Sequence, residues 1–169
     1  IYYNIKTDYG RFKIDYNGSF LDKFEQEAGG LATQLVAASE SGVLPASFPV
    51  TGFADLIGRN GNQKEKHSLR FMWRGEVFGA SLSGYRIGSF YQSELTLEDG
   101  TRYVIPAMTT FDATFDYKTQ VQDVDTRFRL GVRNLTDKRA PLAAESFGFF
   151  NDAHRDYGRY FYMDVSASF

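Results

Sequence analysis

Arginines and aspartates at strand spacing are the residues of this sequence best placed to do chemistry. Arg127, Arg129 and Arg133 follow one such pattern, and Asp112 and Asp116 follow another in the stretch before it. In a β-strand, residues an even number apart point to the same face, so each set shares a face. Centring the link between the two stretches sets Asp116 opposite Arg127. We expect cross-strand ion pairs, and the alternative is a polar surface along a substrate path.

Other reactive groups are too sparse to make a site. His67 and His154 are isolated in the sequence, whereas a metal motif brings several ligands together at short spacing. The chain has no cysteine, which excludes disulfides, thiolate metal sites and cysteine nucleophiles. No spacing of serine, histidine and aspartate indicates a catalytic triad. The sequence therefore predicts neither an enzyme nor a cofactor.

Charge and hydropathy narrow the class of protein. The chain has 19 basic and 21 acidic residues and no basic block, so nucleic acid is not an expected partner. Hydrophobic residues make up 43%, but no stretch approaches the roughly 20 apolar residues of a membrane helix. Membrane-spanning β-strands remain compatible with this composition, because they alternate apolar and polar residues.

Alternation of apolar and polar residues predicts an all-β, antiparallel fold. Residues 31–38, inside an irregular stretch, could form a short helix. The sequence opens and closes within alternating patterns, so we expect residues 1–169 to be a piece of a longer protein. About six full strands and a partial one are expected, at residues 1–5, 10–20, 67–74, 78–92, 108–118, 126–136 and 159–169.

The alternation also assigns residues to two faces of the sheet. A tight turn centred on Gly75 and Glu76 is expected to pair Trp73 with Phe78. Arg86 then falls on the apolar face, unless a bulge near Gly84 resets the pattern. The apolar face should carry Phe12, Phe71, Leu82, Phe111, Phe115, Leu130 and Val165. The polar face should carry Asp15, Arg70, Asp112, Arg129 and Asp164.

The links between strands alternate between long and short. Long connections at 28–65, 92–105 and 138–157 would lie at one edge of the sheet, and tight turns at the other. Transmembrane β-barrels show this asymmetry, together with girdles of aromatic residues at the membrane interfaces. One such belt near the short turns would contain Phe12, Trp73, Phe78, Tyr117, Phe128 and Phe169. A soluble antiparallel domain would explain the alternation equally well, but not the lopsided connections.

The long connections are rich in side chains that could contact a ligand. Aromatic rings in loops stack on glycans or chelates, and they also simply pack their own loops; both interpretations stay open. The candidates are Tyr91, Tyr103, Phe147, Phe149, Phe150 and His154.

The last third of the chain resembles the C-terminal end of TonB-dependent outer-membrane receptors. The resemblance rests on "VIPAMTTFDATFDYKT", on "FRLGVRNLTDKRAP" with its Gly-Val-x-Asn-Leu-x-Asp-Lys element, and on "DYGRYFYMDVSASF" with its terminal Phe169. It covers residues 104–169 well, fits 66–92 more loosely, and fits 1–65 only by pattern.

The resemblance implies a fold and a place in the cell. Such receptors are barrels of about 22 strands around a plug, in the outer membrane of Gram-negative bacteria. The chain would then be a barrel segment facing lipid, an open curved sheet when taken alone, without the plug domain and the TonB-contacting box. The barrel assembly machinery would read its last strand through Phe161, Met163, Val165 and Phe169.

The implied function is energy-coupled import of a scarce nutrient, an iron chelate or an oligosaccharide. The partners would be outer-membrane lipid, the rest of the barrel and its plug, and the TonB complex. An outer-membrane barrel of another class, such as a barrel enzyme or an adhesin, is the alternative, and a soluble antiparallel β-domain is a further one.

Overall fold

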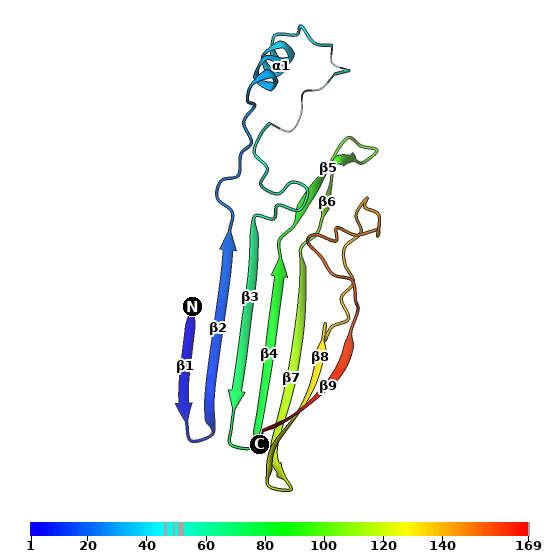
Figure 1. The fold of residues 1–169 in the computed structure, drawn as a ribbon. Helices are drawn as coiled ribbons and strands as arrows, with labels where there is room; N and C mark the ends of the chain where they lie inside the picture. Colours follow the sequence, from blue (N-terminus) through cyan, green and yellow to red (C-terminus); the bar gives the residue numbers. More distant parts are fainter. Residues whose placement is uncertain (46, 49, 51–52, 169) are drawn as a thin grey trace.

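The molecule is built on one antiparallel sheet of seven strands in the order β1-β2-β3-β4-β7-β8-β9. The computed structural model describes residues 1–45, 47–48, 50 and 53–168. Figure 1 shows the strands side by side. They are β1 (Tyr2–Thr7), β2 (Gly10–Phe20), β3 (Glu65–Arg74), β4 (Phe78–Ile87), β7 (Met108–Val121), β8 (Val124–Arg133) and β9 (Tyr160–Ser168).

The seven expected strands are all present, and so is the short helix, α1 (Leu31–Glu40). Most expected bounds agree with the structure to within three residues, and one was wrong by more. The strand expected over 78–92 ends at Ile87, and a separate two-stranded sheet follows, formed by β5 (Phe90–Thr96) and β6 (Arg102–Ile105). The Asp-Gly pair at residues 99 and 100 closes this hairpin, with Gly100 at φ +82°, as expected of a tight hairpin turn.

The expected division into two faces is confirmed. Cross-strand pairing places Phe71 beside Ile14 on β2 and beside Leu82 on β4. On the opposite face, Arg70 pairs with Asp15 and with Ser83. Paired residues project from the same side of a sheet, so one face is apolar from β1 to β9 and the other is polar and charged.

Two registers differ from the expected ones by two residues. Trp73 pairs with Ala80 rather than Phe78, and Asp116 pairs with Arg129 rather than Arg127. The second shift arises at the turn, where Gln122 and Asp123 both adopt positive φ of 50° and 63°. This is the backbone of a two-residue type I′ turn. Because side chains repeat every two residues, a shift of two leaves each face unchanged.

The connections sort to two edges as expected. The short turns after β1, β3 and β7 lie at one edge, and the long connections after β2, β4 and β8 lie at the other (Figure 1). At the first short turn, Gly10 has φ +116°, and a Cβ there would lie 2.5 Å from the carbonyl oxygen of Arg74. The last described residue, Ser168, pairs with Asp125 and therefore lies at the short-turn edge. Phe169 lies outside the described residues.

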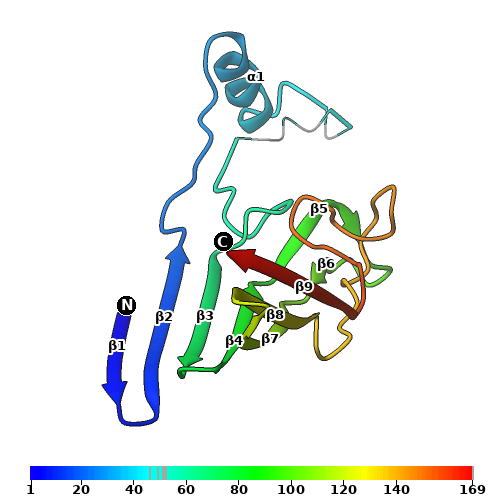
Figure 2. The ribbon, with the colours of Figure 1, turned by 60° about the horizontal axis from the view of Figure 1, so that its bottom comes forward.

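The sheet is open. β1 and β9 lie at its two ends and do not meet (Figures 1 and 2). An open sheet was expected, but the expected curvature was not found: the sheet is twisted and uncurled. Barrel curvature is imposed by closing the first strand on the last, whereas an open sheet retains only the twist of its strands.

Neither face of the main sheet is covered by another layer of the described chain. The helix α1 extends beyond the long-connection edge (Figure 1) and buries none of its own residues. The buried hydrophobic side chains among the described residues are Phe90, Ile105 and Met108, on β5, on β6 and at the start of β7, so the core lies at the long-connection edge of the sheet. No helix in the described part of the chain combines the length and the apolar character needed to cross a membrane.

Candidate functional site

The apolar face is an extended surface of exposed hydrophobic side chains. Phe71 and Phe115 are each 46% exposed, Leu130 is 56% exposed and Phe161 is 76% exposed. They come from four strands of one sheet, so the apolar surface is continuous across it. Large contiguous apolar patches mark sites that contact another protein or a membrane.

Aromatic rings line this face near the short turns. Phe78, Tyr117 and Phe128 lie on three adjacent strands, with ring centroids 5.4 Å and 6.4 Å apart. Phe12 and Trp73 pair on the neighbouring strands, and the Trp73 indole donates a hydrogen bond to the Tyr9 carbonyl. The expected belt is thus assembled from five of its six members, and the sixth is Phe169.

Polar groups appear on the apolar face near the long connections. The Tyr16 hydroxyl hydrogen-bonds to His67 Nδ1 at 2.8 Å, and Glu65 lies 3.6 Å from His67 Nε2 and 3.5 Å from Arg86 Nε. The bulge considered near Gly84 is absent, since β4 pairs continuously with both neighbours. Arg86 therefore remains on the apolar face, close to its upper boundary.

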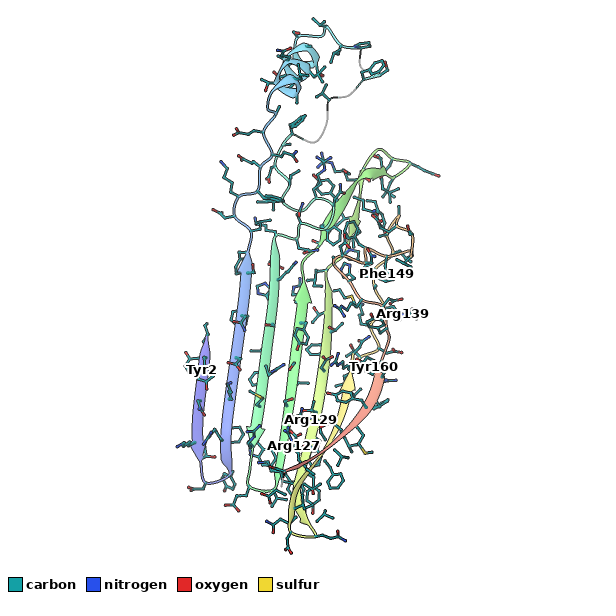
Figure 3. All side chains as sticks on the ribbon, viewed as in Figure 1. Tyr2, Arg127, Arg129, Arg139, Phe149 and Tyr160 are labelled. Carbon is teal, nitrogen blue, oxygen red and sulfur yellow. The ribbon has the colours of Figure 1, made fainter. Side chains whose placement is uncertain are left out.

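On the polar face, Asp116 is the centre of an ion-pair cluster. Arg127 donates to Asp116 Oδ1 from Nε and Nη2 at 3.0 and 2.8 Å, and Arg129 donates from Nε at 2.7 Å. Figure 3 shows both arginines over the lower half of the sheet. One carboxylate thus holds two guanidinium groups from β8, which fixes two strands together.

The other two residues expected to form cross-strand ion pairs, Asp112 and Arg133, have different partners. Asp112 accepts a hydrogen bond from the Asn134 backbone N–H at 2.9 Å. The Arg133 guanidinium lies 5.8 Å from the ring centres of both Tyr160 and Tyr162 on β9. The polar face therefore combines an ion-pair cluster near the short turns with a less tightly paired region higher on the sheet.

Two of the six loop candidates belong to the buried core of the connections. His154 is 1% exposed and stacks on Phe90 with ring centroids 5.7 Å apart; Phe150 meets Phe90 edge-on at 5.1 Å. Among the described residues, neither ring nitrogen of His154 has a hydrogen-bond partner, and the buried amide oxygen and nitrogen of Gln63 have none either. In this arrangement the His154 ring packs against Phe90 of β5.

The remaining loop candidates are more accessible. The Arg102 guanidinium lies over the Tyr91 ring at 4.7 Å, and the Tyr103 hydroxyl donates to the Leu142 carbonyl at 2.9 Å. Phe147 is 71% exposed, and its ring lies 6.3 Å from that of Phe149. Figure 3 places Phe149 among the connections beyond the sheet. These four side chains come from two connections that meet at this edge.

A salt bridge closes the last long connection. Arg139 Nε donates to Asp156 at 2.8 Å, Arg139 Nη2 donates to the second carboxylate oxygen, and the Ala140 backbone N–H adds a bond of 2.7 Å. The hydrogen bonds from Arg139 lower the pKa of Asp156 to about 2. Asp156 is therefore ionised at any physiological pH, and its salt bridge with Arg139 persists.

Acid should loosen the buried loop core. Burial lowers the pKa of His154 below its usual 6.5, so the folded loop binds the proton less well than the unfolded loop. The stability that neutral His154 contributes to the loop core is fully present above about pH 6.5, and it is lost as the pH falls below that value. Going from about pH 7.5 to about pH 5 should lower the protection of the amides in residues 142–154, measured as their exchange rate relative to that of an unstructured peptide at the same pH.

A matched pair of variants isolates this histidine. His154→Phe should abolish the pH effect, whereas His67→Phe should leave it intact, because His67 lies on the sheet and not in the loop core. An unchanged pH effect in the His154→Phe protein would show that another group is responsible.

Sequence reasoning missed the loop core and the polar group around Glu65 and Arg86. The Asp-Gly turn signal could have revealed the β5–β6 hairpin, but no local pattern marks Phe90 or Ile105 as the centre of a cluster. In the described ranges, no three histidine, cysteine, aspartate or glutamate side chains gather in a way that could hold a metal ion. Comparison of the chain with protein-family models, with curated proteins and with solved structures gives no match.

Proposed function

We propose that this chain forms part of the wall of an outer-membrane β-barrel of the TonB-dependent receptor kind, which imports a scarce nutrient. The observation that carries the proposal is the two-faced sheet. One face presents exposed Phe71, Phe115, Leu130 and Phe161, and the other carries arginines and aspartates. A barrel wall has this division, apolar toward lipid and polar toward the lumen.

Strand length and the aromatic row support a membrane setting. β3, β4 and β8 each have ten residues, which matches the roughly 9–11 residues of a tilted membrane-spanning strand. Phe78, Tyr117 and Phe128 would lie at the interface on the short-turn side. The polar cluster of Glu65 and Arg86 would lie at the opposite interface, where charged side chains can reach water and headgroups.

The sheet edges require further strands. Among the described residues, β1 pairs only with β2 and β9 pairs only with β8. Backbone N–H and C=O groups left unpaired in lipid are costly, so barrels close. In the proposed function the outer edges of β1 and β9 pair with strands of the same barrel that lie outside residues 1–169.

A soluble β-domain is harder to reconcile with this structure. In a soluble sandwich the apolar face would be covered by a second layer, because burial of apolar surface provides most of the stability. Here the three buried hydrophobic side chains lie on β5, on β6 and at the first residue of β7, all at the long-connection edge, and no described element covers the sheet. We therefore favour lipid as the partner of the apolar face.

The proposed import cycle assigns different roles to the two ends of the sheet. The long connections would face the cell exterior and make the first contact with the nutrient, through accessible rings such as Tyr91, Tyr103, Phe147 and Phe149. The barrel assembly machinery would recognise β9, whose Phe161, Met163 and Val165 are exposed. The plug and the TonB complex would act through parts of the protein outside this chain.

Membrane fractionation of the full protein tests the proposal. We expect it in the outer-membrane fraction, extractable only with detergent, with the connection at 138–157 open to protease added outside intact cells. Its gene should also encode a plug-like domain upstream of Ile1. Recovery of a folded, detergent-free monomer from the soluble fraction would overturn the proposal, and a barrel without a plug-like domain would favour the barrel enzyme or adhesin.

A further inference from the structure

The polar face contains a hollow of about 490 Å³. Its floor is made of small side chains at the centre of the sheet, where Ser81 and Ser83 on β4 face Thr114 on β7. The hydroxyls of Ser81 and Thr114 hydrogen-bond to each other at 2.7 Å. Short residues on adjacent strands, flanked by long ones, leave a depression with hydroxyl groups at its base.

Three arginines from separate elements surround this floor. Arg70 projects from β3, Arg133 from the end of β8, and Arg155 from the connection before β9. Arg70 donates from Nε to Ser83 at 3.0 Å, and its terminal nitrogens donate to no other group in the described part of the chain. Arg133 rests against Tyr160 and Tyr162, and Tyr160 marks the start of β9 in Figure 3. All three arginines thus line one hollow.

One carboxylate is among the residues that line the hollow. Asp112 lines it, and its Oδ1 already accepts the Asn134 N–H. Asp15, the cross-strand partner of Arg70, lies outside the lining and forms a salt bridge with Lys13. The lining residues therefore carry a surplus of two positive charges. At Asp116, by contrast, the carboxylate accepts hydrogen bonds directly from Arg127 and Arg129. The arginines of the hollow are not held by a carboxylate in this way and keep N–H donors for a ligand.

Size and geometry favour a small ligand. Binding sites for small molecules usually have volumes of about 300–1,000 Å³, and this hollow is within that range. Guanidinium groups bind carboxylate and phosphate oxygens with two parallel hydrogen bonds. Three arginines from three separate elements around one hollow match a ligand with several anionic groups better than one with a single charge.

We propose that this hollow, lined by Arg70, Arg133 and Arg155, binds a small polyanion with two or more carboxylate or phosphate groups. This inference rests on the proposed function and deepens it: the hollow lies on the face assigned to the lumen, between the long connections and the short turns. The imported nutrient is then an anion that meets the arginines after it leaves the outer loops.

Calorimetric titration of the full protein tests this inference, with pyrophosphate and tricarballylate as probes and glucose as the neutral control. We expect both anions to bind and glucose not to bind. Arg133→Gln and Arg155→Gln should each weaken anion binding roughly tenfold, the loss expected when a charged hydrogen bond is removed. Raising the salt concentration should also weaken binding, because the groups are exposed.

Two further variants control for charge and for folding. Arg11→Gln removes the same charge from the same face at the short-turn edge, outside the hollow, and should leave affinity unchanged. Asp112→Asn keeps an oxygen that can accept the Asn134 N–H but removes the opposing charge, so it should strengthen anion binding several-fold. Thermal unfolding of each variant checks that its fold is intact.

The outcomes separate the two proposals. If the protein is found in the outer membrane but binds neither anion, or if the Arg133→Gln and Arg155→Gln variants bind as well as the original, the anion site is wrong and the transport function stands. If the protein is soluble and monomeric without detergent, the transport function fails, whatever the titrations give. Equal losses in Arg11→Gln and Arg133→Gln would reduce the effect to the general charge of the face and overturn the site.

Discussion

Replacing Phe71 with arginine should prevent stable insertion of the protein into the outer membrane. Phe71 lies at the centre of the apolar face, paired with Ile14 and Leu82, and 46% of its surface is exposed. An arginine on the lipid face of a barrel strand costs about 2–4 kcal/mol at the bilayer midplane. Native proteins have total stabilities of about 5–15 kcal/mol, so one such substitution removes a large part.

Met72 offers the matched control, because it is the next residue on β3 and projects to the opposite face. Met72→Arg should be tolerated, since its charge stays on the polar face, and repulsion from Lys13 opposite it costs at most about 1 kcal/mol. The measurement is the amount of heat-modifiable, folded protein in the outer-membrane fraction. Equal yields for the two variants would contradict the assignment of the apolar face to lipid, and a more soluble Phe71→Arg protein would favour the soluble β-domain.

Replacing Phe90 with alanine should open the loop core and leave the main sheet intact. Phe90 is 2% exposed and contacts the rings of both Phe150 and His154. Truncation of a buried phenylalanine to alanine costs about 3–5 kcal/mol, partly through the cavity that remains. The loss falls on the connections, because the strands of the sheet hold their own ladders of hydrogen bonds.

Hydrogen exchange measured segment by segment distinguishes the two regions. Residues 90–105 and 142–154 should lose protection in Phe90→Ala, whereas β3, β4 and β7 should keep theirs. Phe147→Ala makes the same substitution at a side chain that is 71% exposed and should change exchange little. Loss of protection throughout the sheet would show that the connections and the wall unfold as one unit.

The alternation of the sequence determined the strands and their faces. Side chains repeat every two residues along a strand, so Phe71 and Arg70 had to project to opposite sides whatever the partner strands were. The expected faces stayed correct although two registers were displaced, because each displacement was by two residues. The helix could also be predicted from its own residues alone, because residues 31–40 are rich in alanine, the best helix former.

The register between β7 and β8 was decided by a turn geometry that has no clear signal in the sequence. The turn after β7 uses Gln122 and Asp123 at positive φ, where glycine or asparagine is usual, so the pattern placed a longer link there. As a result, Asp116 faces Arg129 across the ladder and reaches Arg127 along it. An ion pair depends on a few ångströms, and periodicity alone cannot fix that distance.

Contacts between connections that are distant in the sequence were decided by the tertiary structure alone. His154 and Phe90 are far apart in the sequence, and no residue spacing predicts that they meet. Packing of the β5–β6 hairpin against the last connection brings them together. The hollow on the polar face arises in the same way, since Arg70, Arg133 and Arg155 converge only after four strands have paired. Periodicity is a property of one segment and can be read from it, whereas convergence depends on how segments pack, and the amino-acid order within each segment does not encode that by itself.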